Sequence, residues 1–185
     1  HIHIESSFLT LSEFAKAVLP HGTTAVFIDC REIVSVLGRD GIDLLMREAK
    51  NLPLKVFFLA PYAVWEKDLE TRGGELTLSD LAELLERSEV VGLGEVVWKY
   101  ALEGREDLIE LILRAQALGK IVDGHIPTRE TRDIGFSRAL GLCSDHESVA
   151  GPEGLQKLRQ GIRLMIREGS ASKNLKGVIK FLLNT

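Results

Sequence analysis

The chain has 185 residues, enough for one domain with a sizeable core. Hydrophobic residues make up 45% of it and charged residues 27%, a composition that argues against disorder. The net charge of −4 comes from mixed signs and gives no reason to expect a nucleic acid or an acidic membrane as a partner. The sequence shows neither an apolar run near the roughly 18 residues of a membrane span nor a secretory signal. We therefore expect a cytoplasmic globular protein.

Short apolar runs alternate with amphipathic stretches along the whole chain. The runs are rich in Val, Ile and Phe, as strands tend to be. We expect strands over 1–5, 23–29, 54–60, 90–96, 120–125, 140–145 and 162–168. We expect helices over 11–18, 41–50, 77–86, 107–118, 129–140 and 172–183, and one that begins at Pro152. This alternation predicts a parallel sheet with right-handed crossovers.

Local signals place several helix boundaries. Thr10 and Glu13 have the spacing of a capping box at a helix start. Asp40 is expected to cap the helix that follows it, and Thr77 or Ser79 to open the next one. These positions fix the helices well enough to place the polar residues that follow each strand.

Seven strand–helix units suit a (β/α)8 TIM barrel that lacks one unit. A complete barrel takes about 250 residues, and residue 1 here is His rather than Met. We therefore expect residues 1–185 to be a single partial barrel domain of a longer protein. Its strand edges would be covered by missing segments or by a second copy in a homo-oligomer.

Four histidines and one glutamate fall at strand ends. His1 and His3 alternate along the first expected strand, so both side chains can face one point. His125, His146 and Glu95 each end or follow a later strand. In a barrel these positions meet at the C-terminal mouth, and imidazoles with a carboxylate suit Zn, Mn or Fe. One ion could take His1 and His3 with a carboxylate, and a second His125 and His146, with Glu95 between them.

Plainer interpretations exist for each residue alone. A single His after a strand is more often a hydrogen-bonded loop residue, and it is the joint pattern that favours metal. Cys30 and Cys143 form no C-x-x-C motif and are expected to be buried, reduced thiols. A ligand role for Cys143, near His146, is the less favoured alternative.

Several stretches are specific enough to suggest a family. They are HIHIESSFLT, VLPHGTTAVFID, GLGEV, DGH, SDHE and IREGSASKNL, in this order. They resemble the adenine deaminase family of the amidohydrolase superfamily nearly from end to end. The resemblance implies a TIM-barrel catalytic domain with a binuclear metal centre, usually Mn or Fe and less often Zn. It also implies that adenine and water become hypoxanthine and ammonia.

The resemblance also assigns roles. It makes His1, His3, His125 and His146 metal ligands and Glu95 the bridging carboxylate. A metal-bound water would supply hydroxide, and a carboxylate would move a proton to the leaving ammonia. Glu95 and Glu147 are our candidate catalytic carboxylates, because the family's strand-eight Asp would lie past residue 185.

The expected strand–helix loops, which would contact the substrate, differ from the family pattern. Relatives usually have Asp-Pro-His-Glu where residues 29–32 read Asp-Cys-Arg-Glu. Glu32, Trp65 and Trp98 lie in expected strand–helix loops and are candidate contacts to a purine-like heterocycle, although rim packing is the plainer role for the tryptophans. Because these loops differ, two alternatives stay open. The substrate could be a different purine or another cyclic amidine, or the chain could belong to an inactive deaminase-like binding or regulatory protein.

Overall fold

The computed structural model describes residues 1–62 and 71–184. Its contacts divide the chain into two compact units, His1–Glu95 and Val96–Thr185, which are described separately. Within the described residues, none of the helices combines the length and apolarity needed to cross a bilayer.

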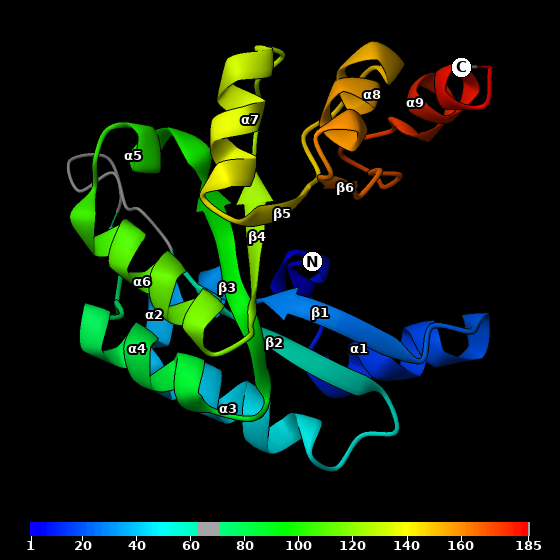
Figure 1. Ribbon diagram of the computed structural model, residues 1–185. Coiled ribbons are helices and arrows are strands. Elements are labelled where there is room, and N and C mark those ends of the chain that lie inside the picture. The colour runs from blue at the N-terminus through cyan, green and yellow to red at the C-terminus, as the bar shows by residue number, and fades with distance from the viewer. Residues whose placement is uncertain (63–70, 185) are drawn as a thin grey trace. The chain divides into compact units, whose positions relative to one another are not determined.

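The first unit is built on parallel strands in the order β1, β2, β3. These are β1 (Ala25–Asp29), β2 (Lys55–Pro61) and β3 (Val90–Val97), the last of which ends just past the unit boundary. Strands β1 and β2 run side by side in Figure 1 and pair in register from Ala25 opposite Lys55. Strands β2 and β3 carry continuous buried runs, as parallel strands covered on both faces do, whereas exposed and buried residues alternate at the start of β1, where Phe27 is exposed.

Helices connect and cover these strands. They are α1 (Leu11–Val18), α2 (Arg31–Leu37), α3 (Arg39–Ala49) and α4 (Leu78–Glu86), with 3-10 turns η1 (Ile4–Ser7) and η2 (Leu19–His21). Their buried apolar faces include Leu11 on α1, Met46 on α3 and Leu84 on α4, which pack into the core with Ile28 and Phe58 of the sheet. The core therefore holds the strand ends in fixed positions.

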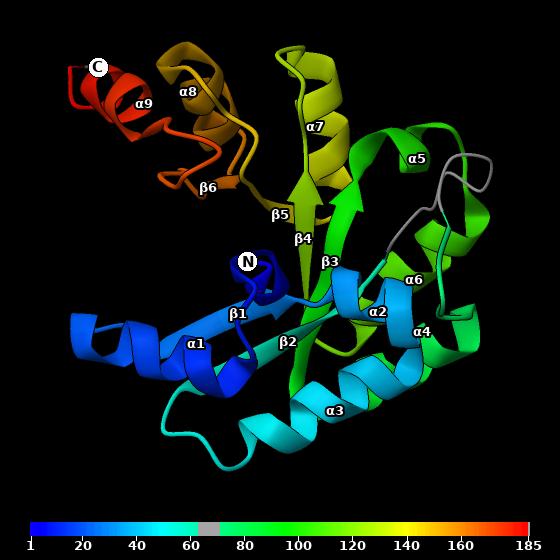
Figure 2. The same ribbon diagram turned by 180° about the vertical axis from the view of Figure 1, so that it is seen from behind.

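The second unit repeats the alternation. Its elements are α5 (Trp98–Leu102), α6 (Glu106–Ala117), β4 (Ile121–His125), α7 (Thr131–Ala139), β5 (Leu142–Asp145), α8 (Gly151–Arg159), β6 (Arg163–Leu164) and α9 (Leu175–Leu182). Strands β4, β5 and β6 are parallel neighbours in this order. Helices α8 and α9 lie together in both Figure 1 and Figure 2.

Most predicted elements are confirmed, and parallel strands that alternate with helices in both units fit an incomplete α/β barrel. Of the capping box expected at Thr10 and Glu13, the structure gives one bond: the Thr10 hydroxyl accepts from the Glu13 amide at 3.3 Å. Thr77 opens α4, as expected, and forms a full capping box that was not predicted: its hydroxyl accepts from the Asp80 amide, and the Asp80 carboxylate accepts from the Thr77 amide.

Two strand predictions need correction. The expected strand over 1–5 is wrong, because only Ile2 bridges to Ile28 before the chain turns into η1. The Ser7 hydroxyl donates to the Ile4 carbonyl there, a local bond that competes with strand pairing. The strand expected over 162–168 is also too long. The Asn174 amide donates to the Arg167 carbonyl, so the chain folds back on itself instead of continuing along β5.

The helix predictions are wrong where the sequence carries a weak signal for a helix start or none. Asp40 does not cap α3, which begins one residue earlier, at Arg39 after Gly38. Helices α2 and α5 were not predicted, and neither has a side-chain cap to signal its start. Both are short, and burial of Val34 and Ala101 respectively anchors them to the core.

Candidate metal centre

The first cluster consists of His1, His3 and Glu95. Hydrogen bonds between Ile2 and β1 fix the backbone between the two histidines: Ile2 donates to Phe27 and accepts from Asp29. Glu95 lies near the end of β3 and is buried. Three segments of the first unit, the N-terminal segment, β1 and β3, therefore position this cluster.

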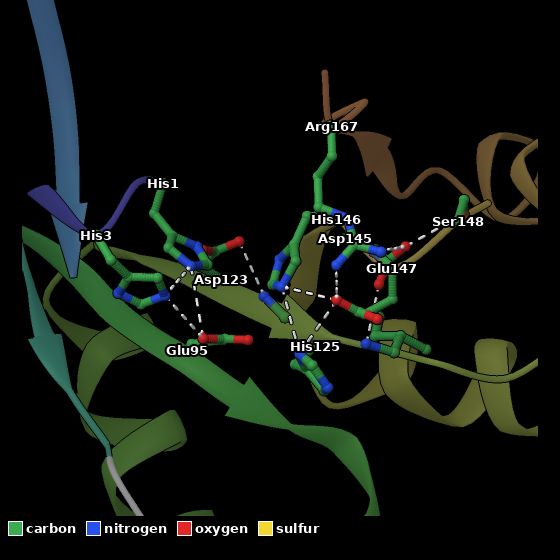
Figure 3. A network of polar contacts seen from close by, with 12 residues as sticks. His1, His3, Glu95, Asp123, His125, Asp145, His146, Glu147, Ser148 and Arg167 are labelled. Atoms are coloured by element: carbon green, nitrogen blue, oxygen red, sulfur yellow. Dashed lines mark hydrogen bonds and ion pairs between the residues drawn. The ribbon is translucent and has the colours of Figure 1, made fainter. Parts of the chain in front are cut away.

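The nitrogen and oxygen atoms of the first cluster face one another (Figure 3). His1 Nε2 lies 3.3 Å from His3 Nε2, and each nitrogen lies 3.5 Å from Oε2 of Glu95. For a metal–nitrogen distance of about 2.0–2.1 Å, the edge of a regular tetrahedron is about 3.3–3.4 Å. The three ligand atoms thus have the mutual spacing that a tetrahedral divalent ion requires.

The backbone fixes how His3 presents its ring. Nδ1 of His3 lies 2.8 Å from the Asp29 carbonyl oxygen, which can only accept, so Nδ1 is the donor. Neutral His3 therefore keeps its lone pair on Nε2, toward the cluster. Burial disfavours the protonated ring, but the hydrogen bond to Glu95 and the charge of Asp29 outweigh it and raise the pKa of His3.

Arg31 and Asp29 add charge beside the first cluster. Arg31 Nη2 donates to Oε2 of Glu95 at 2.7 Å, and Arg31 Nε lies 3.8 Å from Oδ1 of Asp29. Asp29 is fully buried, and among the residues that the structure describes neither carboxylate oxygen has a hydrogen-bond partner. Burial raises the pKa of Asp29, and the nearby Arg31 charge opposes that rise.

The second cluster consists of His125, His146 and Glu147. His125 ends β4, and His146 and Glu147 follow β5 directly. Nδ1 of His125 lies 3.3 Å from Nε2 of His146, and Oε1 of Glu147 lies 3.8 Å and 3.3 Å from these two nitrogens. Figure 3 shows the three side chains facing one another, and their spacing also suits one divalent ion.

Arg167 holds the carboxylate of the second cluster. Its Nη1 donates to Oε1 of Glu147 at 2.6 Å, the same oxygen that faces the two histidines. Arg167 thus stands to Glu147 as Arg31 stands to Glu95. In both units an arginine partly neutralises the glutamate that the histidines approach.

The donor atoms of both clusters suit a divalent metal ion. Each provides two imidazole nitrogens and one carboxylate oxygen, the donors that Zn, Mn and Fe accept in catalytic sites. The predicted ligands His1, His3 and Glu95 come together in one unit, and His125 and His146 come together in the other. The bridging role of Glu95 stays a prediction.

The structure describes two of the three candidate substrate contacts, Glu32 and Trp98. Glu32 lies on the first turn of α2, where Oε2 is 3.6 Å from Nδ1 of His3. Trp98 begins α5 and is partly exposed. Trp65 lies outside the described residues. A role in substrate binding stays a prediction for all three.

The cysteines are free thiols, as predicted. Cys30 is fully buried, and burial raises its pKa well above the ordinary value. A thiol with such a pKa is neutral near pH 7 and therefore unsuited to nucleophilic chemistry. Cys143 is partly exposed, and its Sγ lies 3.7 Å from the Ser144 hydroxyl.

Sequence reasoning missed several residues that support the clusters. Arg31, Arg167, Asp29 and Asp145 were not predicted as site residues, although each stands within three residues of a predicted one or follows a strand. The available signal was position: Asp29 and Asp145 are the last residues of β1 and β5. An acidic residue that ends an apolar strand is a reasonable candidate for a site at the strand ends.

Comparisons with known proteins agree with the motifs. The chain matches no protein-family model. It is 43% identical over 176 residues to an adenine deaminase of Archaeoglobus fulgidus, 41% over 181 residues to one of Clostridium acetobutylicum and 39% over 180 residues to one of Bacillus subtilis. These alignments cover 95%, 97% and 97% of the chain. They cover 31%, 32% and 31% of the relatives, so the chain spans about a third of their length.

Proposed function

Because this is a partial adenine-deaminase-like chain with two His-His-Glu clusters, we propose that it forms most of the catalytic barrel of a metal-dependent hydrolytic deaminase. The barrel would be of the amidohydrolase type. Its reaction would convert adenine and water to hypoxanthine and ammonia. The observation that carries the proposal is the convergence of the imidazole nitrogens and carboxylate oxygens in both units at distances that suit a divalent ion.

The proposed roles follow from the donor sets. His1, His3, His125 and His146 would hold two divalent ions, with Mn or Fe favoured and Zn an alternative, and Glu95 would bridge them. A divalent metal bound by such residues makes a water acidic enough to be hydroxide near neutral pH. His3 keeps Nε2 turned toward the cluster because its other nitrogen donates to the Asp29 carbonyl.

Glu147 is our candidate for the proton transfer that the leaving ammonia needs. Its Oε1 lies beside the nitrogens of His125 and His146, and Arg167 holds that oxygen in place. Since a carboxylate has two oxygens, Oε1 of Glu147 can keep its hydrogen bond from Arg167 while Oε2 accepts and donates a proton. Glu32 and Trp98 are the described residues that we propose for contact with a purine-like substrate.

The direct test is an assay of the Mn-loaded protein that contains this chain. We expect equimolar hypoxanthine and ammonia from adenine, and loss of both in His146→Ala. A panel of other aminopurines and cyclic amidines would show whether the altered loops changed the substrate. Two bound metals without ammonia from any of these compounds would contradict the enzymatic proposal and favour a deaminase-like binding protein.

A further inference from the structure

A fully buried lysine lies beneath the second cluster. Lys157 is on α8, and its side chain has no exposed surface. Its Nζ donates to Oδ2 of Asp145 at 2.7 Å and to Oε1 of Glu153 at 3.4 Å. Burying an ammonium group costs several kilocalories per mole in desolvation, and hydrophobic residues of similar volume often serve stability as well. The placement of this charge therefore calls for an explanation other than stability.

Asp145 joins the two segments that carry the histidines. Its Oδ1 accepts from the Ile126 amide at 2.9 Å, and Ile126 follows His125 directly. Its Oδ2 accepts from the Glu147 amide at 3.1 Å and from the Ser148 hydroxyl at 3.2 Å, on the segment that carries His146. One carboxylate thus fixes the end of β4 relative to the end of β5.

Lys157 completes the set of donors to this carboxylate. With the ammonium group, Asp145 accepts from four donors, one on Oδ1 and three on Oδ2. The lysine compensates the buried negative charge, and hydrogen bonds from charged donors are the strong ones. Glu153 and the Arg129 guanidinium, 3.7 Å from it, extend the same network to the surface of the unit.

We propose that the buried Lys157–Asp145 pair positions His125 and His146 for metal binding. Neither side chain belongs to the donor set of the second cluster; the pair sets the separation of the two backbone segments, and through them that of the ring nitrogens. This inference rests on the proposed metal site. Partners that orient metal ligands from outside the ligand set change metal affinity by about 10–100-fold when removed.

The test uses the protein that contains this chain, with His1→Ala and His3→Ala, so that Zn²⁺ binding reports the second cluster. In this background we expect Lys157→Met to weaken Zn²⁺ binding about 10–100-fold in isothermal titration calorimetry. It should also lower the Tm by roughly 10 °C, because it leaves a buried carboxylate without its counterion. Ser137→Ala is the matched control. Ser137 is equally buried in the same unit, but its hydroxyl donates to the Asp133 carbonyl within α7. The Ser137→Ala variant should therefore bind Zn²⁺ with the affinity of its parent.

A second variant keeps the test decisive if Lys157→Met unfolds. Asp145→Asn with Lys157→Met removes both charges and should recover much of the lost Tm. Whichever way the Asn amide turns, its NH2 group faces a backbone amide donor, that of Ile126 or that of Glu147, so Zn²⁺ binding should remain about 10–100-fold weaker. If this folded double variant binds Zn²⁺ as tightly as its parent, the inference is wrong while the metal site stands. If the parent itself binds no Zn²⁺ through His125 and His146, both the site and the inference are wrong.

Discussion

The two clusters use the same side-chain types but are supported in different ways. In the first, the partner that orients His3 is a backbone carbonyl, that of Asp29. In the second, a buried side chain, Asp145, ties together the segments of both histidines. Backbone support cannot be removed by a side-chain substitution, whereas side-chain support can. The second cluster should therefore be the more sensitive to substitutions outside its ligands.

The clusters also differ in charge. The first has two buried carboxylates, Glu95 and Asp29, near the guanidinium of Arg31. In the second, Glu147 is matched by Arg167. A surplus of negative charge favours cation binding, so the first cluster should be the tighter site for a divalent ion.

The largest expected effect is the loss of one ion when one histidine pair is removed. His1→Ala with His3→Ala should abolish Zn²⁺ binding at the first cluster and leave the second, and His125→Ala with His146→Ala should do the reverse. Zinc per folded chain, measured after dialysis, gives the result directly. His21→Ala, in the 3-10 turn η2, is the control and should change nothing. If either double variant keeps the zinc content of the parent, the cluster that it removes does not bind zinc.

Two glycines that precede ligands should respond unequally to alanine. A Cβ on Gly124 would lie 2.6 Å from the backbone oxygen of Ser144, which cannot move without shifting β5. A Cβ on Gly94 would lie 2.7 Å from Cδ1 of Leu59, the end of a flexible side chain. We expect Gly124→Ala to cost about 3 kcal/mol and Gly94→Ala about 1 kcal/mol in the free energy of unfolding. Equal urea midpoints for the two variants would contradict the expected difference between the two glycines.

Removal of either arginine should strengthen metal binding. Arg31→Met and Arg167→Met each free a carboxylate oxygen and remove a positive charge from beside the ion. We expect about a tenfold gain in Zn²⁺ affinity, or about 1.4 kcal/mol, with the larger gain for Arg31. Arg132→Met, at an exposed position of α7, should have no effect. Weaker binding in both variants would mean that the arginines organise the ligands rather than compete with the ion.

The smallest effect concerns the two strand-end aspartates. Burial raises the pKa of Asp29 above its ordinary 3.8, so the folded chain holds this proton more tightly than the unfolded chain. Stability of the metal-free chain should then fall as pH rises from 3.8 through the raised pKa. Asp29→Asn should remove this fall and gain about 1 kcal/mol or less near pH 7.

Asp145→Asn serves as the contrasting variant, because its carboxylate is fully hydrogen-bonded and its loss should destabilise the chain. Urea unfolding from pH 4 to pH 7 measures both variants against the parent. A gain in stability for Asp145→Asn, or a pH dependence of Asp29→Asn identical to that of the parent, would contradict the contrast between the clusters.

How far the sequence predicted the molecule depends on the range of the interactions involved. Apolar runs such as that of β2 and helix-start residues such as Thr77 are local signals, and they placed most strands and helices. The hydroxyl of Ser7 and the fold-back at Arg167 decide local structure against an apolar pattern, so strands were predicted where the chain turns. His125 and His146 could be predicted as a pair because the ends of β4 and β5 meet at one edge of a parallel sheet. His1 and His3 come together although the expected strand is absent, because the Ile2 bridge to β1 holds the backbone between them.

The supporting residues could not be predicted in the same way. Arg31 and Arg167 reach their glutamates across about 64 and 20 residues of sequence, and neither lies in a pattern that specifies a partner. Lys157 looks like one of several basic residues on a solvated helix face, yet it is fully buried against Asp145. Only the packing of α8 onto the sheet shows which basic residue points inward.

The central claim is that this chain carries two His-His-Glu sets, each able to hold a divalent ion. Equilibrium dialysis against Zn²⁺, followed by elemental analysis of the folded chain, tests it most directly. We expect two zinc ions per chain, falling to one when either histidine pair is replaced by alanine. A zinc content of zero, or a content that the histidine substitutions do not change, would contradict the claim.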